Sequence, residues 1–185
     1  AINFEQGKGG SQQVEGTKAG YRLERQSPPF VVLARDNGIT ISRLAPYDKW
    51  EDLAEEAERL WRSYCDICKP EAAMRAATRF INRLELPADG IDFDDYLTGG
   101  PTVPKGLPQV VNHFVSRLVI THDPSGSNIA ISQVMESANP LTRKVVVIID
   151  IDVYKDVNLP CNSAEIWNNL AVMRGLKNQA FFNSL

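Results

Sequence analysis

The stretch Arg79-Phe-Ile-Asn-Arg-Leu-Glu-Leu-Pro87 decides how this chain is expected to fold. From position 79 to position 86, the even positions are apolar except for Asn82, and the odd positions are charged except for one isoleucine. Successive side chains of a strand point to opposite faces, so this alternation is typical of a strand with one buried face. The stretch therefore predicts a strand with Arg79 and Arg83 on its open face and Asn82 on its core face.

Strand patterns also precede and follow this stretch. Asn37-Gly38 stands between two β-prone runs and is a strong hairpin signal, because both residues tolerate a positive φ. Turn residues separate the later runs at Asp123-Pro124-Ser125-Gly126 and at Asn139-Pro140. The other predicted strands are Tyr21–Glu24, Phe30–Arg35, Ile39–Leu44, Phe114–Thr121, Ile129–Glu136 and Val145–Tyr154.

A first amphipathic helix is predicted from Trp50 to Tyr64, where apolar residues recur every three or four positions. Asp48 is its expected N-cap, and Glu51 three residues later would complete a capping box. A short helical turn is also expected between Pro70 and Ala77.

A second helix is predicted at the C-terminal end of the chain. It opens with Asn162 as the expected N-cap, has Glu165 three residues later, and continues to Phe181. In contrast, Ala88 to Pro108 has four glycines and three prolines and predicts a long irregular connection. So long a connection is expected to be either a functional loop or a cover over a sheet edge.

The predicted order of elements is ββ-α-β-βββ-α, without the regular strand–helix alternation of a parallel sheet. The predicted fold class is therefore α+β, with one antiparallel sheet of about six strands and two long helices packed on one face. Residues 21–185 are expected to form a single domain, and residues 1–20, rich in Gly, Gln and Lys, a flexible lead-in. The chain opens on Ala1 rather than Met, which leaves open that it is a fragment of a longer protein.

The composition is that of a globular protein, with 43% hydrophobic and 23% charged residues in 185. A net charge of −3 offers no general attraction to nucleic acid or to acidic membranes. No window reaches the roughly 18 to 20 apolar residues that span a bilayer, and the N-terminal region has no signal-peptide core. Three cysteines suggest no disulfide framework, so a reducing cytoplasm is the expected location.

Four segments stand out together along residues 21 to 185. They are Ile41-Ser-Arg-Leu-Ala-Pro-Tyr-Asp-Lys-Trp50, Arg79-Phe-Ile-Asn-Arg-Leu-Glu-Leu-Pro87, Ile149-Asp-Ile-Asp-Val-Tyr154 and Leu176-Lys-Asn-Gln-Ala-Phe-Phe182. In this order they resemble a sporadically distributed family of uncharacterised prokaryotic proteins. The most specific motifs are Tyr-x-x-Trp before the first helix and Asn-Arg-x-x-Leu-Pro in the strand. Members of that family usually carry an additional N-terminal βα segment, which is not recognisable here. The resemblance implies no activity, because the family has no settled biochemical function.

Arginines and aspartates are expected to share one face of the sheet. Asp150 and Asp152 lie two apart on one strand and so share a face. Arg79 and Arg83, four apart, share one face of another strand, and Arg117 projects from a third strand. Three interpretations stay open. The face is a salt-bridged solvent face, or a binding surface for an anionic ligand or partner, since Arg suits carboxylate and phosphate. The third is a divalent-metal site on the two aspartates, as in a nuclease.

Asn82 is the polar exception on the predicted core face. An unpaired amide there would cost roughly 1 to 3 kcal/mol, so a hydrogen bond to a neighbouring loop or to a buried Ser or Thr is expected. A ligand contact in a pocket between sheet and helices is the alternative.

Other motifs do not predict chemistry. Cys65-Asp66-Ile67-Cys68 follows a long helix, where the helix dipole does not lower a thiol pKa, and a second pair of zinc ligands is missing. His113 and His122 flank one predicted strand, roughly 30 Å apart at the rise of a strand, and are not expected to share a metal.

The leading hypothesis is a non-enzymatic binding or interaction module, with an unknown protein partner or an anionic ligand. One alternative is a metal-dependent hydrolase or nuclease using the two aspartates. The other is a carrier of a small apolar ligand, with Trp50, Trp61 and Trp167 either lining its pocket or anchoring the core. No catalytic residue, metal ligand or cofactor is predicted, nucleic acid and membrane are not expected as partners, and a homodimer is left open. The expected binding residues are Arg79, Asn82, Arg83, Arg117, Asp150 and Asp152, together with the loop Ala88–Pro108.

Overall fold

The computed structural model describes residues 20–88, 91–136, 141 and 143–185. The chain divides into two compact units, residues 1–69 and residues 70–185, which are described here one at a time. The single domain expected over residues 21–185 stays a prediction. The expected lead-in, residues 1–20, lies outside the described residues except for Gly20, the first residue of a strand.

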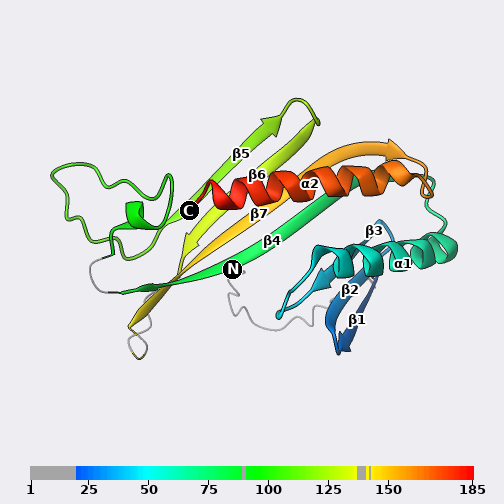
Figure 1. Ribbon diagram of the computed structural model, residues 1–185, viewed down its shortest axis with the longest axis horizontal. Coiled ribbons are helices and arrows are strands. Elements are labelled where there is room, and N and C mark those ends of the chain that lie inside the picture. The colour runs from blue at the N-terminus through cyan, green and yellow to red at the C-terminus, as the bar shows by residue number, and fades with distance from the viewer. Residues whose placement is uncertain (1–19, 89–90, 137–140, 142) are drawn as a thin grey trace, which may run out of the picture. The chain divides into compact units, whose positions relative to one another are not determined.

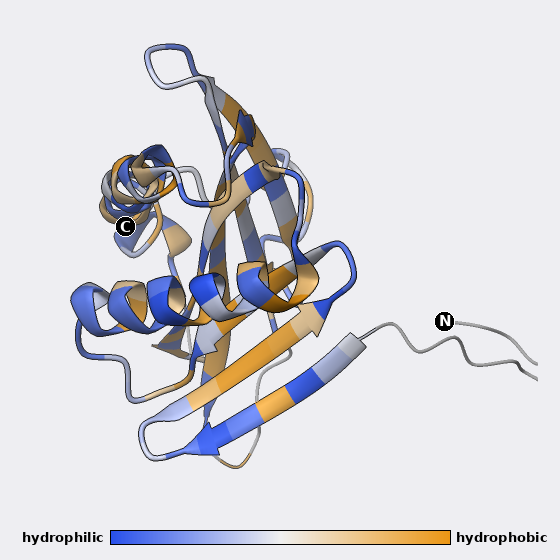
Figure 2. Ribbon diagram, turned by 90° about the vertical axis from the view of Figure 1, so that its right-hand side faces the viewer, coloured by the Kyte–Doolittle hydropathy of each residue, from blue (hydrophilic) through white to orange (hydrophobic). Residues whose placement is uncertain are grey.

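The first unit is a three-stranded antiparallel sheet followed by a helix. Its strands β1 (Gly20–Gln26), β2 (Pro29–Arg35) and β3 (Gly38–Arg43) pair in sequence order. The Asn-Gly hairpin is confirmed, since β2 and β3 are joined by a two-residue turn. Figure 2 shows that β1, next to the grey N-terminal trace, is mostly hydrophilic, whereas β2 beside it is mostly hydrophobic. The central strand therefore supplies the buried side chains of this sheet.

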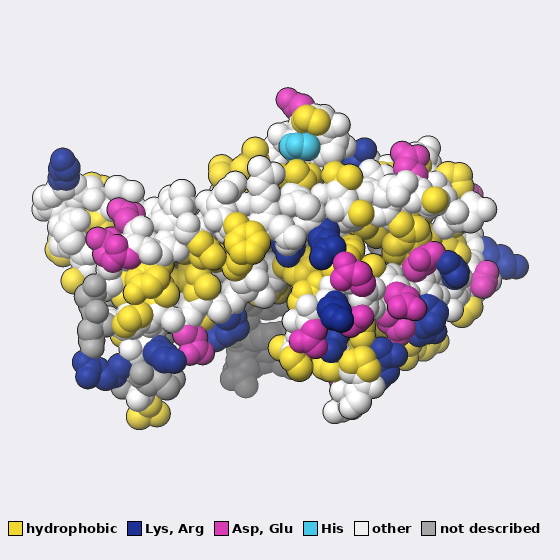
Figure 3. All heavy atoms as spheres, viewed as in Figure 1, with side chains coloured by type: hydrophobic (Ala, Val, Ile, Leu, Met, Phe, Trp, Pro, Cys, Tyr) yellow, Lys and Arg dark blue, Asp and Glu magenta, His cyan; other side chains and the backbone are white. Residues whose placement is uncertain are grey.

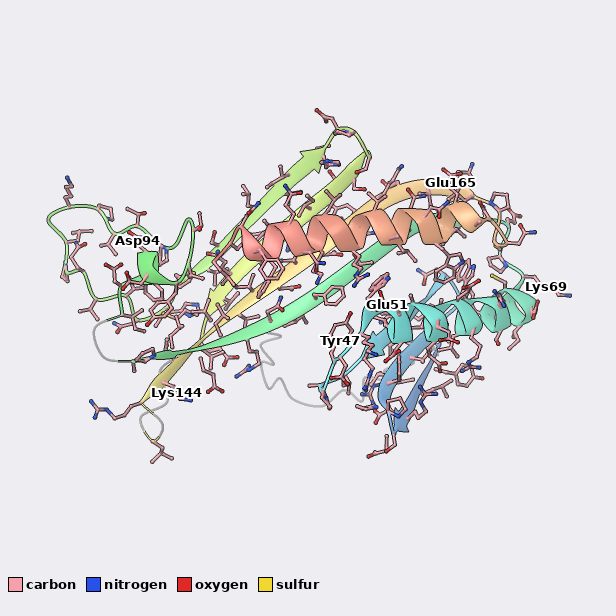
Figure 4. The ribbon with its side chains drawn as sticks, in the orientation of Figure 1. Tyr47, Glu51, Lys69, Asp94, Lys144 and Glu165 are labelled. Carbon is pink, nitrogen blue, oxygen red and sulfur yellow. The ribbon has the colours of Figure 1, made fainter. Side chains whose placement is uncertain are left out.

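In the helix of the first unit, α1 (Trp50–Cys68), Tyr64 is buried, as Phe30 and Val32 of β2 are. The Tyr64 hydroxyl donates to the Arg35 carbonyl at 2.9 Å, which fixes the helix to the end of β2. Its N-cap is Lys49, without a side-chain hydrogen bond, so the predicted cap at Asp48 is wrong. At the other end Lys69 takes a left-handed backbone conformation, with φ of 48°, and ends the helix (Figure 4).

The second unit is a four-stranded antiparallel sheet with a C-terminal helix. Its strand order is β4-β7-β6-β5, so β4 and β5 are the edge strands. In Figure 1, α2 lies along this sheet, and it packs mainly on β4 and β7 and less on β6. The elements are β4 (Ala73–Pro87), the short 3-10 helix η1 (Phe93–Asp95), β5 (Val115–His122), β6 (Ser127–Met135), β7 (Lys144–Leu159) and α2 (Ala164–Phe182).

The predicted strand at Arg79 is the second half of a longer strand. β4 begins at Ala73 and pairs with β7 along its length, so the helical turn expected up to Ala77 is wrong. Ala76 and Thr78 continue the buried side of the alternation. Their small side chains hid the two-residue period, which the larger residues after Arg79 display.

The core of the second unit is centred on β7. Five of its alternate residues are fully buried, in a cluster that α2 and the segment between β4 and β5 complete: Val145, Val147, Ile149, Ile151 and Val153. From the helix, Met173 and Leu176 pack on them. The N-cap of α2 is Ser163, whose hydroxyl accepts from the Glu165 amide at 3.2 Å (Figure 4), so the predicted cap at Asn162 is one residue early.

The α+β class and the antiparallel pairing are confirmed. The single sheet of about six strands with both helices on one face is corrected: the described residues form seven strands in two sheets, of three and four strands. Each sheet packs against one helix, α1 on β3 and α2 on β4, β7 and β6. No described helix is long and apolar enough to cross a membrane.

The tryptophans contribute less to the cores than expected. Trp50, Trp61 and Trp167 are all half-buried, and Trp61 stacks on Tyr64 with 5.7 Å between ring centroids. Aliphatic residues of β7 fill the centre of the second unit instead. A helical tryptophan covers a large area, which permits it to lie at the border of a core rather than inside it.

Candidate functional site

The four-stranded sheet has two different faces, defined by the alternation in β4. Even-numbered residues from Ala76 to Leu86 lie on the α2 side, and odd-numbered residues from Ala77 to Glu85 lie on the opposite side, called here the outer face. The predicted orientation of this strand is therefore confirmed. The predicted binding residues, with the exception of Asn82, fall on the outer face.

Arg79 forms the shortest ion pair of the outer face among the described residues. Its Nε donates to Asp150 Oδ1 at 2.8 Å, and its Nη2 donates to Asp150 Oδ2 at 2.5 Å. A guanidinium and a carboxylate joined by two parallel hydrogen bonds are held in a fixed geometry. These hydrogen bonds raise the pKa of Arg79. The predicted proximity of arginines and aspartates is thus found here.

The other two predicted arginines do not contact the aspartates. Arg83 donates two hydrogen bonds to the Glu136 carboxylate, at 3.2 and 3.3 Å, and Arg117 donates to Ser132 Oγ at 3.3 Å. Glu136 stood at the end of the predicted strand Ile129–Glu136 and follows β6 in the structure, but it was not predicted to contact an arginine. Its closeness to Arg83 depends on the β7–β6 pairing, which no single segment reveals.

Asp152 has a different environment from its neighbour Asp150. Its nearest cation is Arg75, at 3.9 Å, and Arg75 also lies over the Tyr154 ring at 4.3 Å. Burial raises the pKa of Asp152, while Arg75 and Arg79 oppose that shift. Among the described residues, no three His, Cys, Asp or Glu side chains gather as metal ligands would.

Asn82 is half-buried on the α2 side, where the alternation predicts it. Its Nδ2 donates to the carbonyl of Ile149, its partner in β7, at 3.2 Å. The partner is thus a strand backbone rather than the loop or hydroxyl that the sequence suggested. This bond across the sheet has a structural role, because it satisfies a polar group beside the core.

A groove lies on the α2 side of the sheet and was not predicted. Because α2 packs mainly on β4 and β7, the helix-facing residues of β5 remain open, with Leu118 56% and Ile120 44% exposed. The groove encloses about 430 Å³ between these residues, β6 and the C-terminal half of α2. Its lining consists of Thr98, Gly99, Ser116, Leu118, Ile120, Thr121, His122, Ile129, Ile131, Gln133, Leu176, Gln179, Ala180, Asn183 and Ser184.

One end of the groove is fixed by the irregular segment between β4 and β5. The Thr98 amide donates to the Ser184 carbonyl at 3.1 Å, and its hydroxyl donates to the Leu185 carbonyl at 3.1 Å. Phe93 and Leu97 of the same segment are buried in the core. The segment predicted as a loop or cover therefore packs on the second unit and is hydrogen-bonded to the residues that follow α2.

Among the residues that the structure describes, the lining of the groove is uncharged apart from the titratable ring of His122. The Nδ1 atom of His122 lies 2.8 Å from Ser125 Oγ in the β5–β6 turn. Ser125 Oγ also accepts from the Ser127 amide at 3.3 Å, so this Ser–His contact belongs to the turn. Figure 3 shows that hydrophobic and uncharged side chains predominate over α2, whereas basic and acidic side chains are interspersed over α1.

Gln133 is the most unusual residue of the groove. It is only 6% exposed, and its Oε1 atom is buried without a hydrogen-bond partner. The sequence contained a signal for it, since Gln133 stands among aliphatic residues in a predicted strand. The same alternation that identified Asn82 identifies Gln133 as a polar residue on the core side.

A second hollow, of about 830 Å³, lies under the segment between β4 and β5. It is bordered by Asp92 and Asp94, of which Asp92 accepts from the Asp94 amide at 3.1 Å. The hollow adjoins residues 89–90, which are not described, and none of its described lining atoms is both buried and unpaired. It is therefore not considered as a site.

The cysteine and histidine motifs do not assemble into a centre. Cys65, Cys68 and Cys161 are free of disulfides. His113 precedes β5, where its Nδ1 lies 2.7 Å from the Met135 carbonyl, and His122 ends the same strand. The two histidines thus lie at opposite ends of β5, as predicted.

Comparison with known protein families, with curated proteins and with solved structures finds no match for this chain. The resemblance to a family of uncharacterised prokaryotic proteins therefore stays an expectation.

Proposed function

We propose that this protein is a non-enzymatic binding module that holds a small, mainly apolar ligand in the groove between β5, β6 and α2. The observation that carries this proposal is the exposure of Leu118 and Ile120 beside a hollow of about 430 Å³. Ligand pockets of proteins usually enclose about 300 to 1,000 Å³ and are mainly apolar. A ligand in the groove would remove these two side chains from water, which favours binding by about 25 cal/mol per Å² covered.

The outer face gives less support to the recognition of an anionic ligand. Arg79 and Arg83 are each engaged by a carboxylate through two hydrogen bonds. An incoming anion would have to displace Asp150 or Glu136 before it could bind. The metal-dependent alternative meets the same obstacle, because a cation on Asp150 would compete with the Arg79 guanidinium.

Fluorescence of N-phenyl-1-naphthylamine, a neutral apolar dye, tests the groove directly. The wild-type protein is expected to bind the dye and to shift its emission to the blue. Ile120→Trp should block the groove and reduce the affinity at least about tenfold, since filling a pocket removes most of its contacts. Val119→Trp is the matched control, because Val119 precedes Ile120 on the same strand but faces the outer side.

Equal affinity of the two tryptophan variants would contradict the groove as the binding site. Absence of dye binding to the wild-type protein, with a folded circular dichroism spectrum, would contradict the proposed function altogether.

A second candidate function is self-association through β5. This edge strand has eight residues, seven of them exposed, and on its outer side Val115 and Val119 are 65% and 50% exposed. A long apolar edge strand without proline is a template for strand addition. A second copy of the chain is the favoured partner, because antiparallel pairing centred on Leu118 or Val119 places apolar residues together and keeps the two Arg117 side chains apart.

Sedimentation velocity at micromolar concentrations tests this second candidate. The wild-type protein is expected to sediment as a dimer and Val119→Lys as a monomer, since lysine on an edge strand opposes pairing. A wild-type protein that stays monomeric at about 100 μM would contradict it.

A further inference from the structure

We infer that the ligand of the groove is a neutral molecule that donates one hydrogen bond, from an N–H or O–H group, to the side-chain carbonyl of Gln133. This inference rests on the proposed function, because it names the chemical class of the ligand for the same site. It is drawn from a different observation, which is the unsatisfied oxygen of a buried glutamine.

Gln133 lies in the middle of the groove wall. It pairs with Ser116 of β5 and with Ile149 of β7, so its side chain is on the α2 side of the sheet. At 6% exposure the residue is more than nine-tenths buried, and Oε1 has no hydrogen-bond partner. A buried carbonyl that has lost its water without gaining a donor destabilises the folded state.

Only one other side-chain oxygen of the described residues is in the same condition, the hydroxyl of Thr78. Thr78 lies on β4, under α2, and does not line the groove. The two residues differ in access: a ligand in the groove can reach Gln133, whereas Thr78 is enclosed by the protein. Of the two buried unpaired oxygens, the one in Gln133 is beside a space that a donor can enter.

The oxygen can be presented to a ligand by a small movement. The last side-chain torsion of glutamine is broad, so the terminal amide can turn its oxygen or its nitrogen toward the groove. A ligand that donates to Oε1 would hold the amide in the orientation that satisfies the carbonyl. A ligand without a donor would leave the carbonyl unpaired, and its affinity would depend on apolar contact alone.

The charge of the groove selects against ionic ligands. None of the described residues that line it is Lys, Arg, Asp or Glu, and the Nδ1 atom of its histidine is engaged by Ser125. An ion entering the groove would lose its hydration without a counter-charge, which strongly opposes binding. An aromatic or aliphatic body with one hydroxyl or arylamine group, both uncharged at neutral pH, matches the lining, with the body on Leu118 and Ile120 and the donor on Gln133.

Two neutral probes of the same shape test the inference on the full chain. N-phenyl-1-naphthylamine has one N–H donor, and 1-phenoxynaphthalene has an ether oxygen in its place. Affinity for the first is measured by fluorescence, and affinity for the second by its competition with the first. Each is measured with the wild-type protein and with Gln133→Leu, so that the two probes and two proteins form a cycle that isolates the hydrogen bond.

Gln133→Leu is expected to weaken binding of the amine about threefold to tenfold, the range for a neutral hydrogen bond. Binding of the ether should change less than about twofold. An equal effect on both probes, or no effect on either, would overturn the inference while leaving the groove in place. Failure of both probes to bind the wild-type protein would instead refute the proposed function.

Stability of the unliganded protein supplies an independent readout. Because leucine removes an unpaired buried oxygen, Gln133→Leu is expected to unfold at the same or a higher urea concentration than the wild-type protein. A clear decrease would show that the amide has structural partners and would overturn the inference. Gln133→Met, which keeps an unbranched side chain of similar length, repeats both measurements if the leucine variant does not fold.

Discussion

The two faces of β7 are built from the same short stretch of sequence and have opposite characters. Its α2-facing residues from Val145 to Val153 are fully buried aliphatic side chains. Its outer residues, from Val146 to Tyr154, are half-buried and include Asp150 and Asp152, which contact arginines of β4. The difference lies in what covers each face within the second unit: α2 on one side, and long arginine side chains on the other.

This contrast shows how one strand serves two purposes. The helix-covered face supplies most of the hydrophobic stabilisation, because its side chains are removed from water completely. The outer face tolerates polarity, since its charged groups stay partly hydrated and pair across strands. Mutations on the two faces of β7 should therefore differ in size and in their sensitivity to salt and pH.

The largest difference is expected between neighbouring isoleucines of β7. Ile149→Ala should lower the free energy of unfolding by about 2 to 5 kcal/mol, because it leaves a cavity in a fully packed region. Ile148→Ala, on the half-buried outer face, should cost less than half as much. Urea denaturation followed by circular dichroism measures both. Similar midpoints for the two variants would mean that the outer face is as tightly covered as the inner one.

A smaller effect on stability is expected when the Arg79–Asp150 ion pair of the outer face is broken. Asp150→Asn removes the charge but keeps the shape, and should cost about 0.5 to 1 kcal/mol, the upper range for an exposed pair. Since the interaction is electrostatic, the difference from the wild-type protein should shrink in 1 M NaCl. Arg79→Gln is the matching change on the other partner. A cost that is independent of salt would indicate that shape, not charge, holds Asp150.

The neighbouring aspartate should respond in the opposite direction. Burial raises the pKa of Asp152, so its ionised form is disfavoured in the folded state. The protonated form of Asp152 therefore contributes to folding stability below the ordinary pKa of the group, and this contribution is lost as the pH rises through the raised value. Asp152→Asn should then be as stable as the wild-type protein or slightly more stable at pH 7. Below about pH 3.8 this advantage should disappear. Unfolding midpoints from pH 3 to pH 7 measure it, and a loss of stability at pH 7 would contradict the assignment.

The smallest effect concerns Lys177 of α2, whose amine lies 3.8 Å from the centroid of the Phe80 ring. The ring favours the charged amine, but burial and then Arg174 lower the pKa of Lys177. The lowered pKa means that this residue contributes stability above its ordinary pKa of 10.5 and loses it as the pH falls through the lowered value. Lys177→Met removes both the burial penalty and the opposing contact with the ring, so it should change stability at pH 7 by less than about 0.5 kcal/mol. A loss above about 1 kcal/mol would show that the cation–ring contact dominates.

The sequence predicted correctly those features of the fold that depend on a local pattern of residues. The alternation from Phe80 to Leu86 predicted the faces of β4, and Asn-Gly predicted the β2–β3 hairpin, because both depend only on neighbouring residues. The division into two sheets was not predictable, because β1 to β3 read as strands without indicating which sheet they join. The partner of Arg83 also escaped, since Glu136 comes close only through the pairing of β6 and β7.

The groove could not be predicted for a related reason. The exposure of Leu118 and Ile120 depends on where α2 crosses the sheet, and both residues read as ordinary core positions of a strand. Gln133 was recognisable as a polar residue among aliphatic ones. Its unpaired oxygen, however, is a property of the packed structure and has no counterpart in the sequence.

The position of β7 has a consequence for how the second unit folds. It is the last strand in the chain yet lies between β4 and β6, and the Arg79–Asp150 pair joins residues 71 positions apart. Closing so long a segment slows folding, because the chain loses conformational entropy before the strand pairing stabilises it. During synthesis β4 emerges before β7, its partner in the sheet, has been made. Until then the aliphatic side of β4 stays uncovered. The interval before β7 leaves the ribosome is therefore when this chain is most open to aggregation, and when a chaperone would be of most use to it.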